Sequence, residues 1–424
     1  MNRIDLEGKT ILVTGGAGFI GSNLILRLFK DTKSSTIINV DNENDYYDVS
    51  LKTYRLSVIS SEAEKSQCEY HYVKGDIADK ATIDAIFAEY KPQIVVNLAA
   101  QAGVRYSITN PDAYIMSNML GFYNILEACR RSLDSARDDM GRGVISSEVK
   151  KSQQNSEVER SSSAQDDMGR GVISSEVERS SSARLLPSGR KNSQQYSGVE
   201  HLVYASSSSV YGGNKKVPFS TDDRVDNPVS LYAATKKSNE LFAHCYSKLY
   251  NIPTTGLRFF TVYGPAGRPD MAYFGFTNKL LKGETIQIFN YGNCKRDFTY
   301  VDDIVEGIVR VMQGAPERKN GDDGLPIPPY AVYNIGGGQP ENLLDFVTIL
   351  QEELVRAGVL PEDFDFEAHK QLVPMQPGDV PVTYADSTAL ERDYGFTPKI
   401  TLREGLRKFA EWYKSYYSPA TPKL

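Results

Sequence analysis

Cysteine, long apolar runs and an excess of basic residues are all scarce or missing in this sequence of 424 residues. The four cysteines, Cys68, Cys129, Cys245 and Cys294, lie far apart and form no Cys-x-x-Cys pair, which argues against a zinc site or a disulfide framework. Few, unpaired cysteines are typical of a reducing compartment. No apolar run approaches the roughly 20 residues that a membrane span requires, and the first residues do not follow the pattern of a signal peptide.

The charge balance argues against a further group of partners. The formal net charge is -6 and the isoelectric point is about 5.5, so the chain has no general basic field for nucleic acid or anionic membranes. An anionic ligand would have to be bound by a few local Arg and Lys side chains. We expect a soluble, cytoplasmic protein that binds no metal, no nucleic acid and no membrane.

Short apolar runs alternate with helical segments, and this alternation predicts the fold class. Continuous runs of Val, Ile and Leu between helices are typical of parallel strands that are covered on both faces. We therefore predict an α/β fold with a doubly wound, Rossmann-type parallel sheet. Helices are predicted at 22–30 and 230–240. The runs predicted as strands are 10–15, 36–41, 71–76, 93–100, 202–207 and 254–260.

The length allows roughly two to three domains at about 150 residues each. We predict that residues 1–131 and 200–262 form a Rossmann domain. A helix-like run at 301–312 and a strand-like run at 331–336, both within 301–338, are predicted to return to its sheet. The later part of the chain is irregular and rich in Gly, Pro and Tyr. Residues 263–300 and 339–424 are predicted to form a smaller C-terminal domain that binds the substrate.

Residues 132–199 do not follow the alternation of strands and helices. The segment is rich in Ser, Arg, Asp and Glu, and DDMGRGVISSEV occurs in it at 138–149 and unchanged at 166–177. A solenoid repeat would need an apolar face on each unit, and these units have almost none. We interpret the segment as a low-complexity, disordered insertion, with a functional tail or docking segment as the alternative.

The first predicted strand runs into the sequence TGGAGFIG (14–21), which places three glycines at a GxxGxxG spacing before a helix. Such a turn lets backbone N–H groups approach a pyrophosphate, and the helix N-terminus favours its negative charge. Tight strand–helix packing also needs glycines, so a Rossmann-like domain that has lost its nucleotide is the alternative. The residues of this loop predicted to bind a dinucleotide are Gly15, Gly18, Phe19, Ile20 and Gly21.

An acidic residue follows at the end of the second predicted strand. Asp41 lies 26 residues after Gly15, where its carboxylate would accept hydrogen bonds from the adenosine ribose and repel a 2′-phosphate. No Arg follows that could hold such a phosphate, so NAD is preferred over NADP. Asn42 is included with Asp41, and Asp76 and Ile77, after the third strand, are predicted neighbours of the adenine. The alternative for Asp76 is a turn cap.

A row of serines ends the predicted strand at 202–207, and the helix-like SLYAATKKSNE (230–240) follows. Tyr232 and Lys236 are four residues apart and therefore lie on one face of that helix. A lysine ammonium and a positive nicotinamide near the phenol would favour the phenolate and lower its pKa, so that Tyr232 acts as a general base. Ser207 would hydrogen-bond the same substrate hydroxyl. A Tyr-x-x-x-Lys pair alone is weak, but this order of motifs indicates a catalytic set.

These stretches together resemble the extended short-chain dehydrogenase/reductase family, and within it the UDP-glucuronate 4-epimerases. The resemblance covers nearly all of the chain outside the insertion, which is the one large departure from the family's pattern. The matching stretches are TGGAGFIGSNL, NLAAQAGVRYS, EHLVYASSSSVYG, LYAATKK, TTGLRFFTVYGPAGRPDMA, NYGNCKRDFTYVDDIVEGIVR and MQPGDVPVTYAD.

The resemblance implies NAD-dependent 4-epimerisation of UDP-glucuronate through a 4-keto intermediate, for surface polysaccharide synthesis. Ser207, Tyr232 and Lys236 match the family's catalytic Ser/Thr, Tyr and Lys. Tyr232 would take the proton of the sugar 4-OH while hydride moves from carbon 4 to NAD, and hydride would then return to the opposite face. Related dehydratases and decarboxylases place an acidic residue where this chain has Ser208 and Ser209, which favours an epimerase.

The resemblance also implies a set of ligand contacts. Ala99, Ala100 and Gln101 would pass under the cofactor, Asn118 would brace the active-site backbone, and Phe260 would pack near the nicotinamide. The residues implied to bind the substrate are Arg105, Ser207, Ser208, Thr261, Arg268, Phe289, Arg296 and Asp379.

Two ends of the substrate are distinguished in this set. Arg296 matches a position that pairs with the diphosphate, for which its fork of donors is well suited. Asp379 matches one that contacts the uridine ribose. Gln376 stands where relatives often have a second phosphate-binding Arg. The alternative for Arg296 is a surface salt bridge with Asp297 or Asp302.

The other end meets carbon 6 of the sugar, where Thr261 and Arg268 match the positions expected in the glucuronate epimerases. Arg105 is a further cation near this end. Losing a charged hydrogen bond in a buried site costs on the order of 1.5–3 kcal/mol, enough to favour an acid over an alcohol. The alternative for Arg268 is a residue that only closes a turn.

Two rival functions stay open. An epimerase of uncharged sugars, such as UDP-glucose or UDP-N-acetylglucosamine, would share the catalytic residues. A non-catalytic NAD-binding protein would be expected to lack Tyr232 or Lys236, and both are present. By resemblance we also expect a homodimer, formed through the helix near 118–131 and the helix of Tyr232.

Overall fold

The computed structural model describes residues 1–136, 198–376 and 379–417. The predicted insertion at 132–199 therefore lies almost entirely outside the described residues. The helix predicted to end near Arg131 continues through residue 136. Apart from Leu133–Ser197, the chain forms one compact unit, Met1–Ser132 with Gly198–Leu424.

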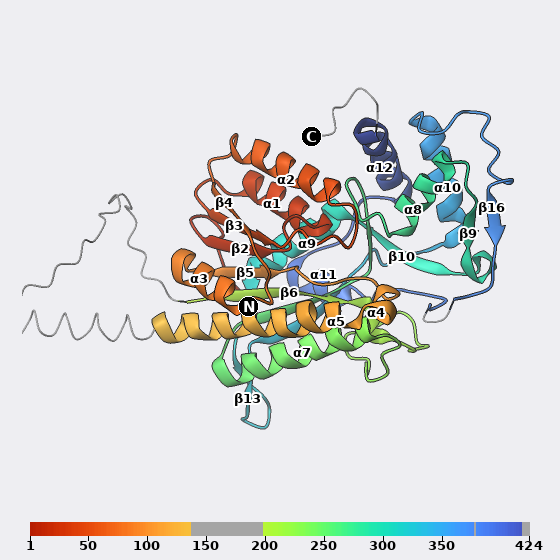
Figure 1. The fold of residues 1–424 in the computed structure, drawn as a ribbon. Helices are drawn as coiled ribbons and strands as arrows, with labels where there is room; N and C mark the ends of the chain where they lie inside the picture. The colour runs from red at the N-terminus through yellow and green to blue at the C-terminus, as the bar shows by residue number, and fades with distance from the viewer. Residues whose placement is uncertain (137–197, 377–378, 418–424) are drawn as a thin grey trace, which may run out of the picture. The chain divides into compact units, whose positions relative to one another are not determined.

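Seven parallel strands form the central sheet, in the order β14-β7-β6-β5-β2-β3-β4 (Figure 1). The inner strands are buried along nearly their whole length, as their Val, Ile and Leu runs require. The order reverses between β2 and β5, so the sheet is doubly wound and the predicted fold class is confirmed. The strands are β2 (Thr10–Thr14), β3 (Thr36–Asp41), β4 (Glu69–Lys74), β5 (Ile94–Asn97), β6 (His201–Ser207), β7 (Thr254–Phe259) and β14 (Tyr330–Ile335).

Helices cover both faces of this sheet (Figure 1). One face carries α1 (Phe19–Asp31), α9 (Val301–Met312) and α11 (Thr388–Tyr394), with α2 (Ser50–Ala63) packed beside α1. The other face carries α3 (Lys80–Tyr90), α7 (Leu231–Tyr250) and a long helical stretch. That stretch consists of α5 (Pro111–Tyr114), the π-helical turn η1 (Ile115–Gly121) and the α-helix through residues 122–136.

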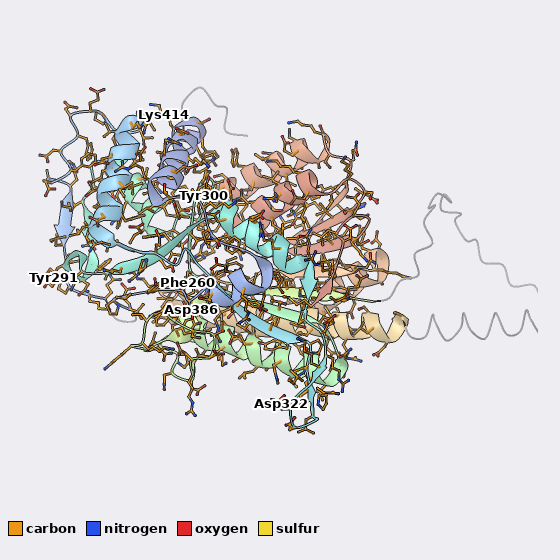
Figure 2. The ribbon with its side chains drawn as sticks, turned by 180° about the vertical axis from the view of Figure 1, so that it is seen from behind. Phe260, Tyr291, Tyr300, Asp322, Asp386 and Lys414 are labelled. Atoms are coloured by element: carbon orange, nitrogen blue, oxygen red, sulfur yellow. The ribbon has the colours of Figure 1, made fainter. Side chains whose placement is uncertain are left out.

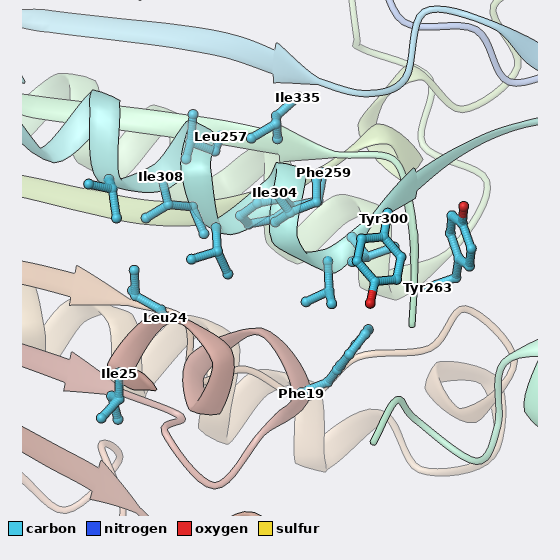
Figure 3. Close-up of a cluster of buried hydrophobic side chains, with 14 of the residues drawn as sticks. Phe19, Leu24, Ile25, Leu257, Phe259, Tyr263, Tyr300, Ile304, Ile308 and Ile335 are labelled. Atoms are coloured by element: carbon cyan, nitrogen blue, oxygen red, sulfur yellow. The ribbon is translucent and has the colours of Figure 1, made fainter. Parts of the chain in front are cut away.

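The core between sheet and helices is formed by apolar faces at helical spacing. Leu24 and Ile25 of α1 lie across from Ile304 and Ile308 of α9, and Ile335 of β14 belongs to the same buried cluster (Figure 3). All five side chains are fully buried. This packing fixes α1, and with it the glycine-rich turn that precedes the helix.

Most of the remaining elements gather beside the carboxyl ends of the sheet strands, and the chain between α9 and β14 adds short strand pairs elsewhere. A small sheet of β15, β10 and β8 continues the chain from the end of β7. The strands here and in the hairpins are β1 (Asn2–Arg3), β8 (Thr261–Tyr263), β9 (Ile286–Ile288), β10 (Lys295–Tyr300), β11 (Gly314–Ala315), β12 (Lys319–Asn320), β13 (Pro326–Ile327), β15 (Pro340–Asn342) and β16 (Lys370–Leu372). The further helices are α4 (Tyr106–Thr109), η2 (Ser208–Tyr211), α8 (Ala272–Leu281), η3 (Phe289–Gly292), α10 (Leu343–Arg356) and α12 (Leu402–Tyr417).

Candidate active site

A cavity of about 960 Å³ lies where the carboxyl ends of the sheet strands face the C-terminal elements. Open α/β sheets bind ligands at this edge, beside the point where the strand order reverses. Phe260, which lines the cavity, lies where the sheet meets the C-terminal elements, whereas Asp322 lies at the tip of the β12–β13 hairpin (Figure 2). The predicted residues that line the cavity are Gly15, Gly18, Phe19, Ile20, Gly21, Asp41, Asn42, Asp76, Ile77, Ala99, Ala100, Gln101, Arg105, Ser207, Ser208, Tyr232, Lys236, Phe260, Thr261, Arg268, Phe289, Arg296 and Asp379.

The glycine-rich loop lies at one end of this cavity. Gly15 has a φ of +75°, and a Cβ there would lie 2.7 Å from the backbone nitrogen of Ala99. A Cβ on Gly21 would lie 2.2 Å from the carbonyl oxygen of Gly15. Helix α1 starts directly after Gly18 without a side-chain cap, so its first N–H groups remain available to an anion. The loop fits a pyrophosphate.

Asp41 ends β3 beside this loop, and its buried carboxylate holds the loop in place. Its Oδ2 accepts from the backbone N–H of Ala17 at 3.0 Å, and its Oδ1 accepts from the backbone N–H of Glu43 at 2.8 Å. Asp76 lines the cavity and also caps its own turn, because its Oδ1 accepts from Ala78 N at 2.8 Å. Asn42 donates to the other oxygen of Asp76 at 2.9 Å. The turn cap is therefore present, and the contact of Asp76 with the adenine stays a prediction.

A buried lysine near Asp41 was missed from the sequence. Lys52, in the first turn of α2, lines the cavity and donates to Asn44 Oδ1 at 2.9 Å. Burial lowers the pKa of its ammonium, while the negative charge of Asp41 acts in the opposite direction. The only sequence signal was a lysine eleven residues after Asp41 at the start of a helix.

Ser207, Tyr232 and Lys236 lie together at the centre of the cavity. Ser207 is the last residue of β6, and its Oγ accepts from Ser209 N at 3.1 Å. Ser230 caps α7 by accepting from Ala233 N at 3.1 Å, which sets the first turn of the helix that carries Tyr232.

The predicted lowering of the Tyr232 pKa depends in part on the positive nicotinamide of bound NAD and stays a prediction. Burial raises this pKa above its ordinary value, although the hydrogen bond from Ser207 and the charge of Arg268 act to lower it. The Nζ of Lys236 donates to the carbonyl oxygen of Ala205 at 2.8 Å. Burial lowers the pKa of Lys236 itself to about 8.

Asn118 is the one predicted cofactor contact that does not line the cavity. Its Oδ1 accepts from Gln101 N at 2.8 Å, and its Nδ2 donates to Gln101 O at 3.0 Å and to Thr235 Oγ1 at 3.0 Å. This buried amide therefore ties the loop after β5 to helix α7 from behind the cavity wall.

The end of the cavity that is predicted to meet the sugar contains Arg268. Its Nε donates to Asp270 Oδ1 at 3.0 Å and its Nη2 to Asp270 Oδ2 at 2.5 Å. Tyr46 donates to the same carboxylate at 3.0 Å. Burial alone would raise the pKa of Asp270, but the adjacent guanidinium outweighs it and holds that pKa below its ordinary value. Asp270 and Tyr46 both line the cavity and were not predicted.

The opposite end carries the residues expected to meet the nucleotide. Arg105 was expected near carbon 6 of the sugar. It lies instead 3.7 Å from a carboxylate oxygen of Asp379, the residue expected to contact the uridine ribose, and over the ring of Phe289, at 5.2 Å from its centroid. Arg296 donates to the carbonyl oxygens of Lys295 and Pro381 at 3.0 and 3.1 Å. The Asp297 carboxylate instead accepts from three backbone N–H groups, those of Gly337, Gly338 and Ala385.

Other classes of site are not seen in the described ranges. No three His, Cys, Asp or Glu side chains within residues 1–136, 198–376 and 379–417 come together in a way that could hold a metal ion. In the same part of the chain, no helix has the length and apolar character to cross a membrane.

The fold and the site define a class of protein. A seven-stranded Rossmann sheet carries a glycine-rich loop, an acidic side chain at the end of the next strand, and a Ser/Tyr/Lys set at the end of β6 and on α7. This combination is that of a dinucleotide-binding enzyme of the short-chain dehydrogenase/reductase type.

Comparisons with known proteins specify the class further. The model of the NAD dependent epimerase/dehydratase family matches residues 173–336, and that of GDP-mannose 4,6 dehydratase matches residues 12–147. Protein CapI of Staphylococcus aureus is 42% identical over 96% of this chain and 99% of its own length. UDP-glucuronate 4-epimerase 4 of Arabidopsis thaliana is 39% identical over 97% of this chain and 77% of its own length.

A solved structure shows the same fold. The UDP-glucuronic acid 4-epimerase from Bacillus cereus, in complex with UDP-glucuronic acid and NAD, is 25% identical, with a TM-score of 0.67 over 96% of this chain and 100% of the other. The chain belongs to the NAD dependent epimerase/dehydratase family. The predictions of NAD as cofactor and of an NAD-dependent nucleotide-sugar epimerase are confirmed.

Proposed function

We propose that this enzyme interconverts UDP-glucuronate and UDP-galacturonate by epimerisation at carbon 4, for surface polysaccharide synthesis. The observation that carries the proposal is Arg268, a guanidinium held by Asp270 in the cavity that also contains Tyr232. Thr261 and Ser208 line the same cavity and add hydroxyl donors. The printed functions of the Arabidopsis and Bacillus relatives support the same sugar.

The chemistry at carbon 4 follows from the central residues. NAD, when bound, accepts and returns the hydride of carbon 4. Tyr232 takes the proton of the 4-hydroxyl and gives it back to the oxygen of the 4-keto sugar, while Ser207 orients that oxygen. The protein's task is to hold these groups in register and to exclude water, since the cofactor supplies the hydride chemistry.

Three Arg side chains line the cavity, and they differ in how far their charge is balanced by a carboxylate. Among the described residues, Arg296 donates to two backbone carbonyl oxygens and to no carboxylate, so its charge is available to the diphosphate. Arg105 faces Asp379, and Arg268 faces Asp270, so each of these two charges is balanced by one carboxylate. Hydrogen bonds to charged groups contribute about 1.5–3 kcal/mol each, and the sugar carboxylate would compete for the Arg268 fork.

A homodimer is part of the proposal. The helical stretch through η1 and the helix α7 lie next to each other and expose large apolar side chains. Exposed apolar surface of this kind is typical of an interaction face. These side chains are Ile115, Met116, Leu120, Tyr123, Leu241, Phe242 and Leu249. Light scattering after size exclusion should give twice the chain mass; a fully active monomer would contradict the dimer.

The deciding experiment is proton NMR of UDP-glucuronate incubated with the purified protein and no added cofactor. Formation of UDP-galacturonate would support the epimerase, the carboxylate preference and tightly held NAD together. An unchanged spectrum beside conversion of UDP-glucose in a parallel tube would keep the mechanism and overturn the role of Arg268. If neither sugar changes after NAD is added, the catalytic proposal fails.

A further inference from the structure

Arg55 is a buried cation outside the catalytic set, and its whole donor fork is used on backbone and phenol oxygens. Its side chain on α2 is 2% exposed. The Nε and Nη2 donate to Ala266 O at 2.9 and 2.7 Å, and Nη2 donates to Gly267 O at 2.9 Å. Nη1 donates to Ala17 O at 3.0 Å and to Tyr47 Oη at 2.6 Å.

These partners belong to the two ends of the active site. Ala17 lies in the glycine-rich loop. Its backbone N–H donates to Asp41 and its carbonyl oxygen accepts from Arg55, so both backbone polar groups of Ala17 are held. Ala266 and Gly267 directly precede Arg268. Ala266 has a φ of +51°, a conformation that a non-glycine residue keeps only when its surroundings impose it.

A second contact reaches the same loop from the same segment of chain. Tyr46 lies five residues after Asp41 and donates to Asp270, the carboxylate that orients Arg268. Burial and the charge of Asp270 raise the pKa of Tyr46 to about 12, so its hydroxyl keeps its proton and acts as a donor. Residues 266–270 are thus held on both sides of Arg268 by residues 46 and 55.

Charge adds to the geometry. Arg268 and Asp270 form a pair with no net charge, which by itself attracts a carboxylate weakly. Arg55 adds one positive charge beneath the loop, and no carboxylate is among its hydrogen-bond partners. Both guanidinium groups act electrostatically on the buried phenol of Tyr273, which lies under Gly267.

We propose that Arg55 and Tyr46 are positioning residues for sugar recognition. Residues 46–55 contact both the loop of Arg268 and the glycine-rich loop. This one piece of chain therefore sets the position of the sugar carboxylate relative to the glycine-rich loop. This inference rests on the proposed function, because it takes the sugar carboxylate as the ligand of Arg268.

The test uses Arg55→Lys and Tyr46→Phe in the full-length enzyme, with Tyr333→Phe as the matched control. Tyr333 also donates to a carboxylate, that of Asp393 at 2.7 Å, but it does not line the cavity. KM and kcat are measured for UDP-glucuronate, UDP affinity by calorimetry, and retained NAD by absorbance after gel filtration.

Arg55→Lys keeps the charge but cannot serve three carbonyls and a phenol. We expect its KM for UDP-glucuronate to rise at least tenfold with kcat changed less than threefold, and NAD retention to fall. Tyr46→Phe should raise KM several-fold and leave NAD retention intact. Affinity for UDP alone, which lacks the sugar, should stay unchanged in both variants. Tyr333→Phe should change none of these quantities.

The outcomes separate the two proposals. Unchanged KM and NAD retention in Arg55→Lys, with an active wild-type enzyme, would overturn the inference. A lower kcat together with a higher KM and weaker UDP binding would show a merely structural role and would also overturn the inference. Absence of wild-type turnover on UDP-glucuronate would contradict the proposed function, whereas NAD retention in Arg55→Lys would still test the link to Ala17.

Discussion

At the scale of single residues, the catalytic lysine is the clearest case of a side chain that function requires and folding opposes. Lys236 is buried, with a single hydrogen bond to the carbonyl of Ala205, and its pKa falls from an ordinary 10.5 to about 8. At neutral pH the native protein therefore carries a cation that burial disfavours. Active sites commonly contain such costs, and their removal stabilises the fold while abolishing activity.

Lys236→Met is expected to inactivate the enzyme and to stabilise the NAD-free protein at pH 7. Each pKa unit corresponds to about 1.4 kcal/mol, and about 1 kcal/mol is lost with the hydrogen bond. The net gain in unfolding free energy is then about 2 kcal/mol, measurable by urea denaturation. Equal or lower stability of the variant would contradict this account.

The same pKa shift fixes a pH window. Between pH 8 and 10.5 the unfolded chain holds the Lys236 proton more strongly than the native protein does. The contribution of Lys236 to the unfolding free energy of the wild-type protein should therefore increase as pH rises through that window. The difference in unfolding free energy between Lys236→Met and the wild-type protein should narrow between pH 8 and 10.5 and stay constant below pH 8. Urea titrations at several pH values would show this.

Tyr232→Phe is expected to lower kcat by about 10²–10⁴-fold, because the group that moves the proton is removed. The shape of the cavity is preserved, so binding of UDP-glucuronate by calorimetry should change little. A variant with substantial turnover would show that another group takes the proton.

The catalytic and cofactor residues could be predicted because their motifs are local in sequence. Three glycines, or a tyrosine and a lysine four residues apart, are visible without knowledge of the fold. Lys52, Asp270, Tyr46 and Arg55 could not be found in this way, because their roles depend on contacts between segments more than 200 residues apart or on single side chains without a spacing pattern.

At the scale of elements, the inner strands of the main sheet were predictable from their continuous apolar runs. The edge strand β4, predicted at 71–76, spans Glu69–Lys74 and has no fully buried residue. Helix α9 has the bounds Val301–Met312 that its sequence suggested, because its apolar residues recur at helical spacing. The short strands β8, β9 and β10 were not foreseen. Three- to six-residue strands with polar residues, such as KRDFTY, carry no clear period, and tertiary pairing decides their structure.

The turn before α1 provides a prediction for an element. Gly21→Ala places a methyl group 2.2 Å from the carbonyl oxygen of Gly15, where only backbone could move away. Overpacking of this kind costs about 1–3 kcal/mol, and the shifted loop should also release NAD. Thermal unfolding and retained NAD measure both effects; Gly213→Ala, where a Cβ meets nothing within 4 Å, is the matched control.

At the scale of the whole molecule, the chain leaves the compact unit at Ser132 and re-enters it at Gly198. These two points are close together, since Val199 N donates to Ser132 Oγ at 3.2 Å. Repeats and polar composition predicted that the residues between them are no part of the sheet. Their own structure lies outside the described residues, and the predicted domain boundaries stay predictions.

A shortened chain tests this arrangement. Replacement of residues 133–197 by a Gly/Ser linker of about four residues should leave kcat and KM within about twofold, because short flexible loops close such a gap at little entropic cost. NMR of UDP-glucuronate turnover and thermal unfolding provide the comparison. Loss of activity in a folded, shortened protein would give the segment a direct part in function.

The contacts of Arg55 and Tyr46 also limit how sugar preference can be transplanted. Moving the 264–270 loop of this enzyme into an epimerase of another sugar would leave behind the guanidinium and the phenol that hold it, because these lie more than 200 residues earlier in the chain. Redesign of the specificity of this enzyme would have to exchange residues 44–55 together with that loop, as a single discontinuous module.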